Sequence, residues 1–262
     1  MRKNVLLTLA ALLVLYVTGY AQKMSYGIKG GLSIPTLTGG NSDNPVNSGY
    51  SSSFGPDGSV YGEYHVNKKF SVTVGLEYSS QGGLKDGVQA FYTTPEFIPY
   101  LPYPTPQFLY GDFKSEAKLN YVLVPVLAKY TWRMAKRSPF RIYAALGPFA
   151  GFLLKAQQDV TQKSDVIYVM NADNTLTPVA QATFGGRNDI KDQLNTFNVG
   201  IEGFVGLSYA ISQKHAMFIE AGGNYGFMQI QKGNEKGNKT GAALISFGYA
   251  YTFQKYKQRG WR

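Results

Sequence analysis

Hydrophobic and polar residues alternate at every second position in two well-separated parts of this chain. In residues 70–79 the apolar set is Phe70, Val72, Val74, Leu76 and Tyr78. In residues 243–253 it is Ala243, Ile245, Phe247, Tyr249, Tyr251 and Phe253. The intervening residues are small or polar, with an occasional carboxylate. A period of two predicts β-strands, and this pairing of an aromatic face with a small polar face is typical of barrels with lipid outside and a polar interior.

The same alternation indicates eight strands in the whole chain. They are expected at 24–34, 58–66, 70–80, 118–132, 140–154, 196–211, 216–230 and 240–253. The connections at 67–69, 133–139 and 212–215 are short, whereas 35–57, 81–117 and 155–195 are long. Long loops at one end and short turns at the other are typical of outer-membrane barrels. We therefore predict one domain, residues 22–253, folded as an all-β, eight-stranded antiparallel up-and-down transmembrane β-barrel with long extracellular loops and short periplasmic turns.

A soluble eight-stranded barrel of lipocalin type is the rival architecture, because it also alternates. Its outer face would be densely charged. Here the polar face is mostly glycine, serine, threonine and asparagine, with one or two charges per strand. The membrane barrel is therefore favoured over the soluble one.

The first residues predict export. Arg2 and Lys3 precede an apolar stretch at 5–17, and Gly19 and Ala21 occupy the small-residue positions of a cleavage site. An uncleaved membrane helix is the alternative, but the apolar stretch is shorter than the roughly 20 residues that span a bilayer. We expect a cleaved signal peptide at 1–21 and localisation to the bacterial outer membrane. The chain has no cysteine, which excludes disulfides and a lipid-modified N-terminal cysteine.

The formal net charge of +10 raises the question of nucleic acid. The lysines and arginines are scattered through loops, turns and the tail rather than gathered in one stripe, so no nucleic acid is expected. Outer-membrane lipid and the phosphates of lipopolysaccharide are the expected partners of this charge. The basic tail at 254–262 is expected in the periplasm, either as a frayed end or as an anchor to an anionic surface.

Six charged residues fall on the face that should point into the barrel. They are Lys29, Glu63, Glu77, Lys129, Glu202 and Glu220. An eight-stranded barrel is only wide enough inside to be filled by side chains, so we expect these charges to pair across the lumen as a plugged, salt-bridged core. A proton or ion path is the functional alternative.

No enzyme is expected. The two histidines, His65 and His215, fall near the predicted periplasmic turns, away from the long loops. The sequence contains no nucleophile-elbow serine and no histidine cluster with the spacing of metal ligands, so neither a cofactor nor a metal is predicted.

The second long loop is the strongest candidate for function, because prolines alternate there with aromatic residues. The aromatic residues are Tyr92, Phe97, Tyr100, Tyr103, Phe108 and Tyr110. Proline lowers the entropy of a free loop and aromatic rings offer rigid contact area, so binding of a sugar or a peptide is one interpretation. The other is that these rings fold onto the barrel rim and cover its outer aromatic girdle.

Several short segments resemble the PorT-like outer-membrane β-barrel proteins of Bacteroidota. They are residues 27–33 (GIKGGLS), 76–82 (LEYSSQG), Tyr121 with 124–130 (VPVLAKY), 145–149 (ALGPF), 197–200 (FNVG) with Gly203, and 224–226 (NYG). The chain departs from this family at Leu123, where such proteins often carry an inward carboxylate, and in its nine-residue tail. The resemblance implies the barrel fold and the outer membrane.

Four functions remain open at this point. The leading hypothesis is a non-enzymatic structural or loop-mediated binding protein of the cell envelope. The second is an accessory component of the type IX secretion or gliding machinery, with a partner in that machinery, which only the family name implies. A small diffusion channel is disfavoured by the size of the barrel, and an enzyme comes last.

Overall fold

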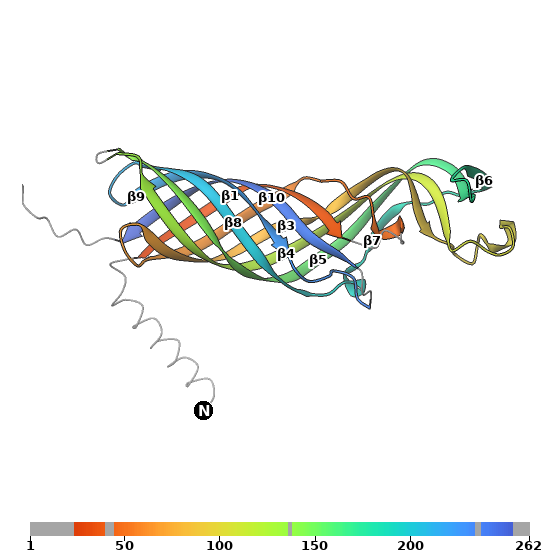
Figure 1. The fold of residues 1–262 in the computed structure, drawn as a ribbon, viewed down its shortest axis with the longest axis horizontal. Helices are drawn as coiled ribbons and strands as arrows, with labels where there is room; N and C mark the ends of the chain where they lie inside the picture. The colour runs from red at the N-terminus through yellow and green to blue at the C-terminus, as the bar shows by residue number, and fades with distance from the viewer. Residues whose placement is uncertain (1–23, 40–44, 136–137, 234–236, 254–262) are drawn as a thin grey trace, which may run out of the picture.

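A computed structural model describes residues 24–39, 45–135, 138–233 and 237–253 of the chain (Figure 1). The predicted signal peptide at 1–21 and the predicted tail at 254–262 lie outside the described residues. Within these residues, none of the helices has the length and apolar character needed to cross a membrane.

The described chain forms one antiparallel sheet of ten strands. The strands are β1 (Met24–Gly39), β2 (Gly55–His65), β3 (Phe70–Tyr92), β4 (Phe108–Arg133), β5 (Phe140–Met170), β6 (Leu176–Gln181), β7 (Gly186–Asp189), β8 (Phe197–Ala210), β9 (His215–Gly226) and β10 (Asn238–Phe253). Pairing of β1 with β10 and of β4 with β5 closes a ring that contains β1, β2, β3, β4, β5, β8, β9 and β10. This is the predicted barrel of eight strands, each paired with its neighbours in the chain.

The two additional strands, β6 and β7, lie outside the ring. Both pair with β5, along the edge that β8 occupies further down the strand. β5 and β6 form a hairpin within the segment 155–195 that the alternation predicts as a long connection, with Met170 opposite Leu176. β7 is a further strand in the same segment.

The faces of the barrel strands are as predicted. Along β3, Val74 and Leu76 are about half exposed on the outside, whereas Glu77 is completely buried in the interior. Aromatic residues mark two levels of the outer face: Phe140 lies beside Tyr209 near the short turns, and Phe152 lies beside Phe197 near the long loops. On β5 these levels are twelve residues apart. At about 3.3 Å per residue and a tilt of ~40°, they are roughly 30 Å apart, which suits a bilayer.

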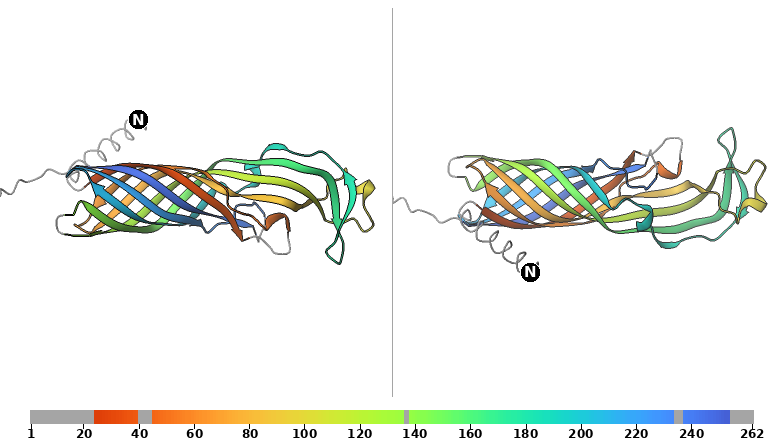
Figure 2. Two further views of the ribbon diagram at one scale, coloured as in Figure 1. Left: turned by 90° about the horizontal axis from the view of Figure 1, so that it is seen from above. Right: turned by 90° about the horizontal axis from the view of Figure 1, so that it is seen from below.

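Three strands continue far beyond the aromatic level near the long loops, which we call the upper level. Pairing of β2 with β3 stops at Ser79, and pairing of β5 with β8 stops at Phe152. Residues 80–92 of β3, 108–120 of β4 and 153–170 of β5 stay paired with one another above that level. Together with β6 and β7 they form a projection that we call the exterior blade, which extends from one side of the barrel mouth in both views of Figure 2.

The blade corrects three predicted boundaries. Strands expected at 70–80, 118–132 and 140–154 actually span Phe70–Tyr92, Phe108–Arg133 and Phe140–Met170. Most of the two long loops expected at 81–117 and 155–195 is therefore regular sheet. The prediction stopped where the lipid-facing apolar residues stopped, but above the membrane the outer face of a strand meets water and no longer needs to be apolar. The remaining boundaries differ by at most five residues, most of all at the first strand, which reaches Gly39, and the seventh, which ends at Gly226.

Candidate functional site

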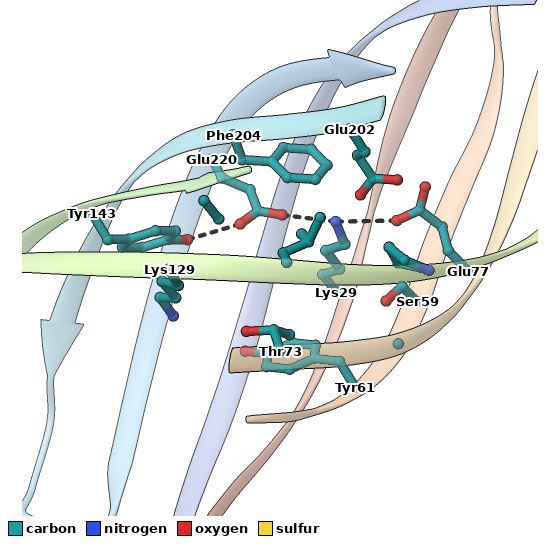
Figure 3. A pocket seen from close by; sticks show the side chains of 14 residues that line it. Lys29, Ser59, Tyr61, Thr73, Glu77, Lys129, Tyr143, Glu202, Phe204 and Glu220 are labelled. Carbon is teal, nitrogen blue, oxygen red and sulfur yellow. Dashed lines mark hydrogen bonds and ion pairs between the residues drawn. The ribbon is translucent and has the colours of Figure 1, made fainter. Parts of the chain in front are cut away.

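Charged and aromatic side chains from five strands meet in the middle of the barrel (Figure 3). Lys29 of β1 lies 3.2 Å from the carboxylate of Glu77 on β3 and 2.9 Å from that of Glu220 on β9. Its ammonium group also lies 3.8 Å from the centre of the Phe204 ring. The Tyr143 hydroxyl donates a 2.8 Å hydrogen bond to Glu220. Lys29 is therefore the centre of a cross-lumen network of ion pairs.

A second ion pair lies nearer the short turns. The Lys129 ammonium group is 2.9 Å from the Glu63 carboxylate, and the Ser71 hydroxyl donates a 2.6 Å hydrogen bond to the same carboxylate. His65 also lies here, 3.6 Å from Glu63. The structure thus brings Glu63 and Lys129 together as a second pair. Tyr143 connects this pair to the Lys29 network, because the Lys129 ammonium group lies 4.2 Å from the centre of the Tyr143 ring.

Glu202 departs from the expected pairing. Its side chain is 1% exposed and lines the same cavity as Lys29, but among the described residues neither of its oxygens has a hydrogen-bond partner. The sequence also placed Asp57 outside the barrel, although it is buried at the start of the inward face of β2. Among the described residues, the lumen therefore holds five carboxylates, Lys29, Lys129 and, near Glu63, Arg141, so the acidic groups outnumber the cations. The cavity between them has a volume of about 40 Å³, room for a few water molecules at most.

Apolar side chains fill the barrel mouth above this charged layer. The cluster consists of Leu37, Ala117, Leu119, Tyr121, Leu123, Phe149, Leu153, Ala156, Leu194 and Ile230, with Tyr50 and Ile190 packed against it. Leu123, the position at which a carboxylate is common in the resembled family, is 2% exposed within this cluster. We call this cluster the apolar plug. It separates the charged lumen from the exterior.

A groove with a volume of about 720 Å³ lies directly on the outer side of the apolar plug. Ala117, Leu194 and Tyr50 belong to both, so the plug forms the floor of the groove. The inward faces of β3, β4 and β5 continue upward as its wall, because side chains two residues apart in a strand share one face. Pockets that bind small ligands usually measure about 300–1,000 Å³, so this groove is large enough to bind one.

Aromatic rings occupy the upper end of the groove. Phe91 lies 6.2 Å from Phe97, 6.3 Å from Phe113 and 5.9 Å from Phe184, measured between ring centres. Phe113 and Phe184 are 5.2 Å apart in an edge-to-face arrangement. These contacts hold the β3–β4 loop and the β6–β7 connection against the blade. We call the four residues the phenylalanine cluster.

The structure distributes the six predicted loop aromatics along the end of the blade. Tyr92 and Phe97 line the groove, and the ring centre of Tyr92 is 5.5 Å from that of Phe108. Tyr100 and Tyr103 are 67% and 97% exposed in the loop beyond. Tyr110 pairs with Ala90 and Tyr168 in the sheet. The rings thus lie at the far end of the blade, and the alternative in which they cover the outer girdle of the barrel does not describe this arrangement.

Several groove residues were missed because they fall in segments predicted as loops. Among these are Lys85, Gln89, Phe113, Gln158 and Phe184. A signal was present in the sequence: from Leu109 to Leu123 every second residue is apolar or small, which continues the alternation of β4 downward from the blade to the barrel. Within the described residues, histidine and acidic side chains do not gather in a group that could hold a metal ion.

A closed eight-stranded ring with an apolar outer band, aromatic girdles and short turns at one end defines a small outer-membrane β-barrel. The model of the outer membrane protein beta-barrel domain family matches residues 20–232 of the chain. The chain belongs to this family, which places it in the outer membrane. The narrower resemblance to PorT-like proteins stays a prediction. No curated protein matches the sequence.

Several solved outer-membrane proteins are similar to the chain at low sequence identity. Neisserial surface protein A is 12% identical, over 87% of this chain and 97% of that chain, with a TM-score of 0.39. OprG from Pseudomonas aeruginosa is 11% identical, over 89% of this chain and 97% of that chain, with a TM-score of 0.42. A major outer membrane protein from Thermus thermophilus is 11% identical, over 88% of this chain and 99% of that chain, with a TM-score of 0.42.

Proposed function

We propose that this protein is a non-enzymatic binding protein of the outer membrane, and that it binds its ligand in the groove above the barrel mouth. The observation that carries the proposal is the position of the groove. It opens to the exterior, it is walled by the blade and its phenylalanine cluster, and its floor is the apolar plug. A ligand that reaches the groove is held outside the membrane rather than passed through the barrel.

The filled lumen argues against a diffusion channel. A cavity of about 40 Å³ surrounded by ion pairs, below a layer of buried leucine and aromatic side chains, is no path for a solute.

The groove also lacks the groups that an enzyme would need. Its lining contains neither a histidine nor a pair of carboxylates, and Glu96 is its one acidic residue among the described side chains.

A matched pair of substitutions on β5 tests the proposal. Gln157 and Gln158 are consecutive, so they lie on opposite faces of the strand, and only Gln158 lines the groove. The detergent-solubilised protein would be applied to glycan and peptide arrays. We expect retention of a subset of array ligands, loss of that retention in Gln158→Trp because the indole fills the groove, and full retention in Gln157→Trp.

Two results would contradict the proposal. One is array binding that survives Gln158→Trp unchanged, which would place the binding surface elsewhere. The other is a stable ion conductance of the purified barrel in a planar bilayer, which would show that the lumen is open in the membrane.

A further inference from the structure

The groove contains one deeply buried cation. Lys85 lies on the groove face of β3 and is 7% exposed. Its ammonium group donates hydrogen bonds to the carbonyl oxygens of Pro45 at 3.1 Å and Val46 at 2.9 Å, and lies 4.8 Å from the centre of the Tyr50 ring. Lys85 therefore fastens the β1–β2 connection to the blade, and the groups that its ammonium contacts among residues 45–135 are neutral.

Lys85 has no acidic partner among the described residues. The other charged groups that line the groove are Glu96, in the β3–β4 loop, and Lys232, whose ammonium group donates to the carbonyl oxygen of Asp192 at 2.9 Å. Neither forms an ion pair with Lys85, and Tyr50 is the other titratable group packed against it. Burial without a compensating charge lowers the pKa of Lys85 to about 8. A buried charge of this kind is costly unless an opposite charge reaches it.

Apolar surface begins a short distance from this cation. Phe113 lies opposite Gly87, two residues along β3 from Lys85, and Phe91 follows four residues later on the same face. At about 3.3 Å per residue, the backbone positions of Phe113 and Phe91 lie roughly 7 and 20 Å along the strand from Lys85. Their rings lean toward each other, with 6.3 Å between the ring centres. Gln89 lies between the two regions along β3, and Gln158 lines the groove on β5, where its side chain donates a hydrogen bond to Ser115, the residue paired with Lys85. The groove thus offers a positive end and an aromatic end.

We infer that the groove binds an anionic amphiphile, with its carboxylate or phosphate group on Lys85 and its apolar body against Phe113 and Phe91. This inference rests on the proposed function, since it names the class of ligand for the same groove. The anion supplies a charge that none of the described residues supplies, and an ammonium group carries three donors, of which the two carbonyl oxygens use two. The third is available to the ligand.

The number of N–H donors on Lys85 also distinguishes an anion-binding role from a purely structural role. A neutral lysine amine still carries two N–H donors, enough for the carbonyl oxygens of Pro45 and Val46. Raising the pH therefore removes the charge of Lys85 and leaves its hold on the β1–β2 connection intact. A structural lysine would tolerate this change, whereas an anion-binding lysine would lose its ligand.

The test uses two probes of equal shape, 3-phenylpropanoate and 3-phenylpropanamide. The full chain, labelled with ¹⁵N in phosphatidylcholine nanodiscs, would be titrated with each while its backbone amide signals are recorded. We expect the carboxylate to shift the signals of Lys85, Gln89 and Phe113 and to bind at least about tenfold more tightly than the amide at pH 7. Above about pH 8 the carboxylate affinity should fall by about tenfold per pH unit, while the amide affinity stays constant.

Lys85→Met should abolish the preference for the carboxylate. Lys114→Met should keep it, because Lys114 carries the same charge on the exposed opposite face of the blade. If Lys85→Met disturbs the blade, the pH series on the unmodified protein decides. Equal affinity of the two probes in the groove would overturn the ligand class and leave groove binding intact. Absence of any carboxylate-induced shift would overturn the inference too, and the array experiment would still judge the proposed function separately.

Discussion

The barrel and the exterior blade share three strands, β3, β4 and β5, yet the two faces of these strands have opposite character in the two regions. Within the barrel, β4 turns Val122, Val124 and Val126 outward, and its inward face meets the charged lumen. In the blade, the same strand turns Lys114, Glu116 and Lys118 outward. Its inward residues there are apolar or small and line the plug and the groove. The alternation continues without interruption while its polarity reverses.

The reversal follows from the solvent. Lipid surrounds the barrel, so apolar side chains are stable outside and polar ones must find partners inside. Water surrounds the blade, so charged side chains are stable on its outer face, where Lys118 lies 2.9 Å from Asp159 and Arg187 pairs with the same carboxylate. Apolar side chains of the blade then gather on its inner face, which lines the groove. The comparison teaches that strand periodicity reports the faces, and that the surroundings decide which face is apolar.

The largest expected effect is the loss of stability when an ion pair inside the barrel is broken, compared with the loss of an ion pair on the surface of the blade. Lys29→Met removes the cation between Glu77 and Glu220, which leaves buried carboxylates uncompensated and should lower the unfolding free energy by about 3–5 kcal/mol. Lys163→Met breaks the pair with Asp86 on the blade, where both side chains are nearly half exposed, and should have no measurable effect. Urea unfolding in lipid vesicles, followed by tryptophan fluorescence, measures both. Equal losses would show that the lumen network is not buried from water.

Two valines on the outer face of β3 sharpen the same comparison. Val74 in the barrel is 48% exposed and Val88 in the blade is 52% exposed. Val74→Lys should cost roughly 2–4 kcal/mol because a charge then faces lipid. Val88→Lys should be tolerated, since that side chain faces water. The measurement is the fraction of heat-modifiable, folded protein on unboiled gels together with the unfolding midpoint. A blade in contact with lipid would make both variants fail alike.

Two glutamates in the lumen should respond in opposite directions to loss of charge. Glu202→Gln removes a carboxylate that lacks a hydrogen-bond partner among the described residues, and should raise the unfolding free energy by about 1 kcal/mol. Glu220→Gln removes an ion pair with Lys29 and weakens the bond from Tyr143, and should lower the unfolding free energy. The same urea titration compares them. A loss of stability in Glu202→Gln would indicate an additional partner for that carboxylate.

The smallest effect is the pH dependence of the blade. Burial lowers the pKa of Lys85 from 10.5 to about 8, so between these values the unfolded chain binds the proton more tightly than the folded chain does. Stability contributed by this residue therefore rises with pH across that window. The thermal midpoint of the blade, followed by protease resistance, should rise more from pH 7.5 to 9.5 in the unmodified protein than in Lys85→Met. An identical rise in both would remove Lys85 as the cause.

Much of the barrel could be predicted from the sequence. The eight strands of the ring, the direction of each face and the inward position of the six charged residues all follow from a period of two, because a strand turns successive side chains to opposite sides. The partners of those charges did not follow. Glu77 and Glu220 meet Lys29, and Glu202 pairs with neither lysine, because the stagger between neighbouring strands sets which inward residues share a level.

The sequence by itself determined the closed barrel, its outer apolar band and the charged inward face, since these are local consequences of alternation against lipid. Only the tertiary structure decided where the membrane part ends, that β3, β4 and β5 continue as a blade, and that Lys85 and the phenylalanine cluster share one groove above the apolar plug. The physical reason is that residues far apart in the chain, from Tyr50 to Lys232, become neighbours only when the ring closes and the loops pack over its mouth. No local sequence pattern predicts which of these distant residues become neighbours.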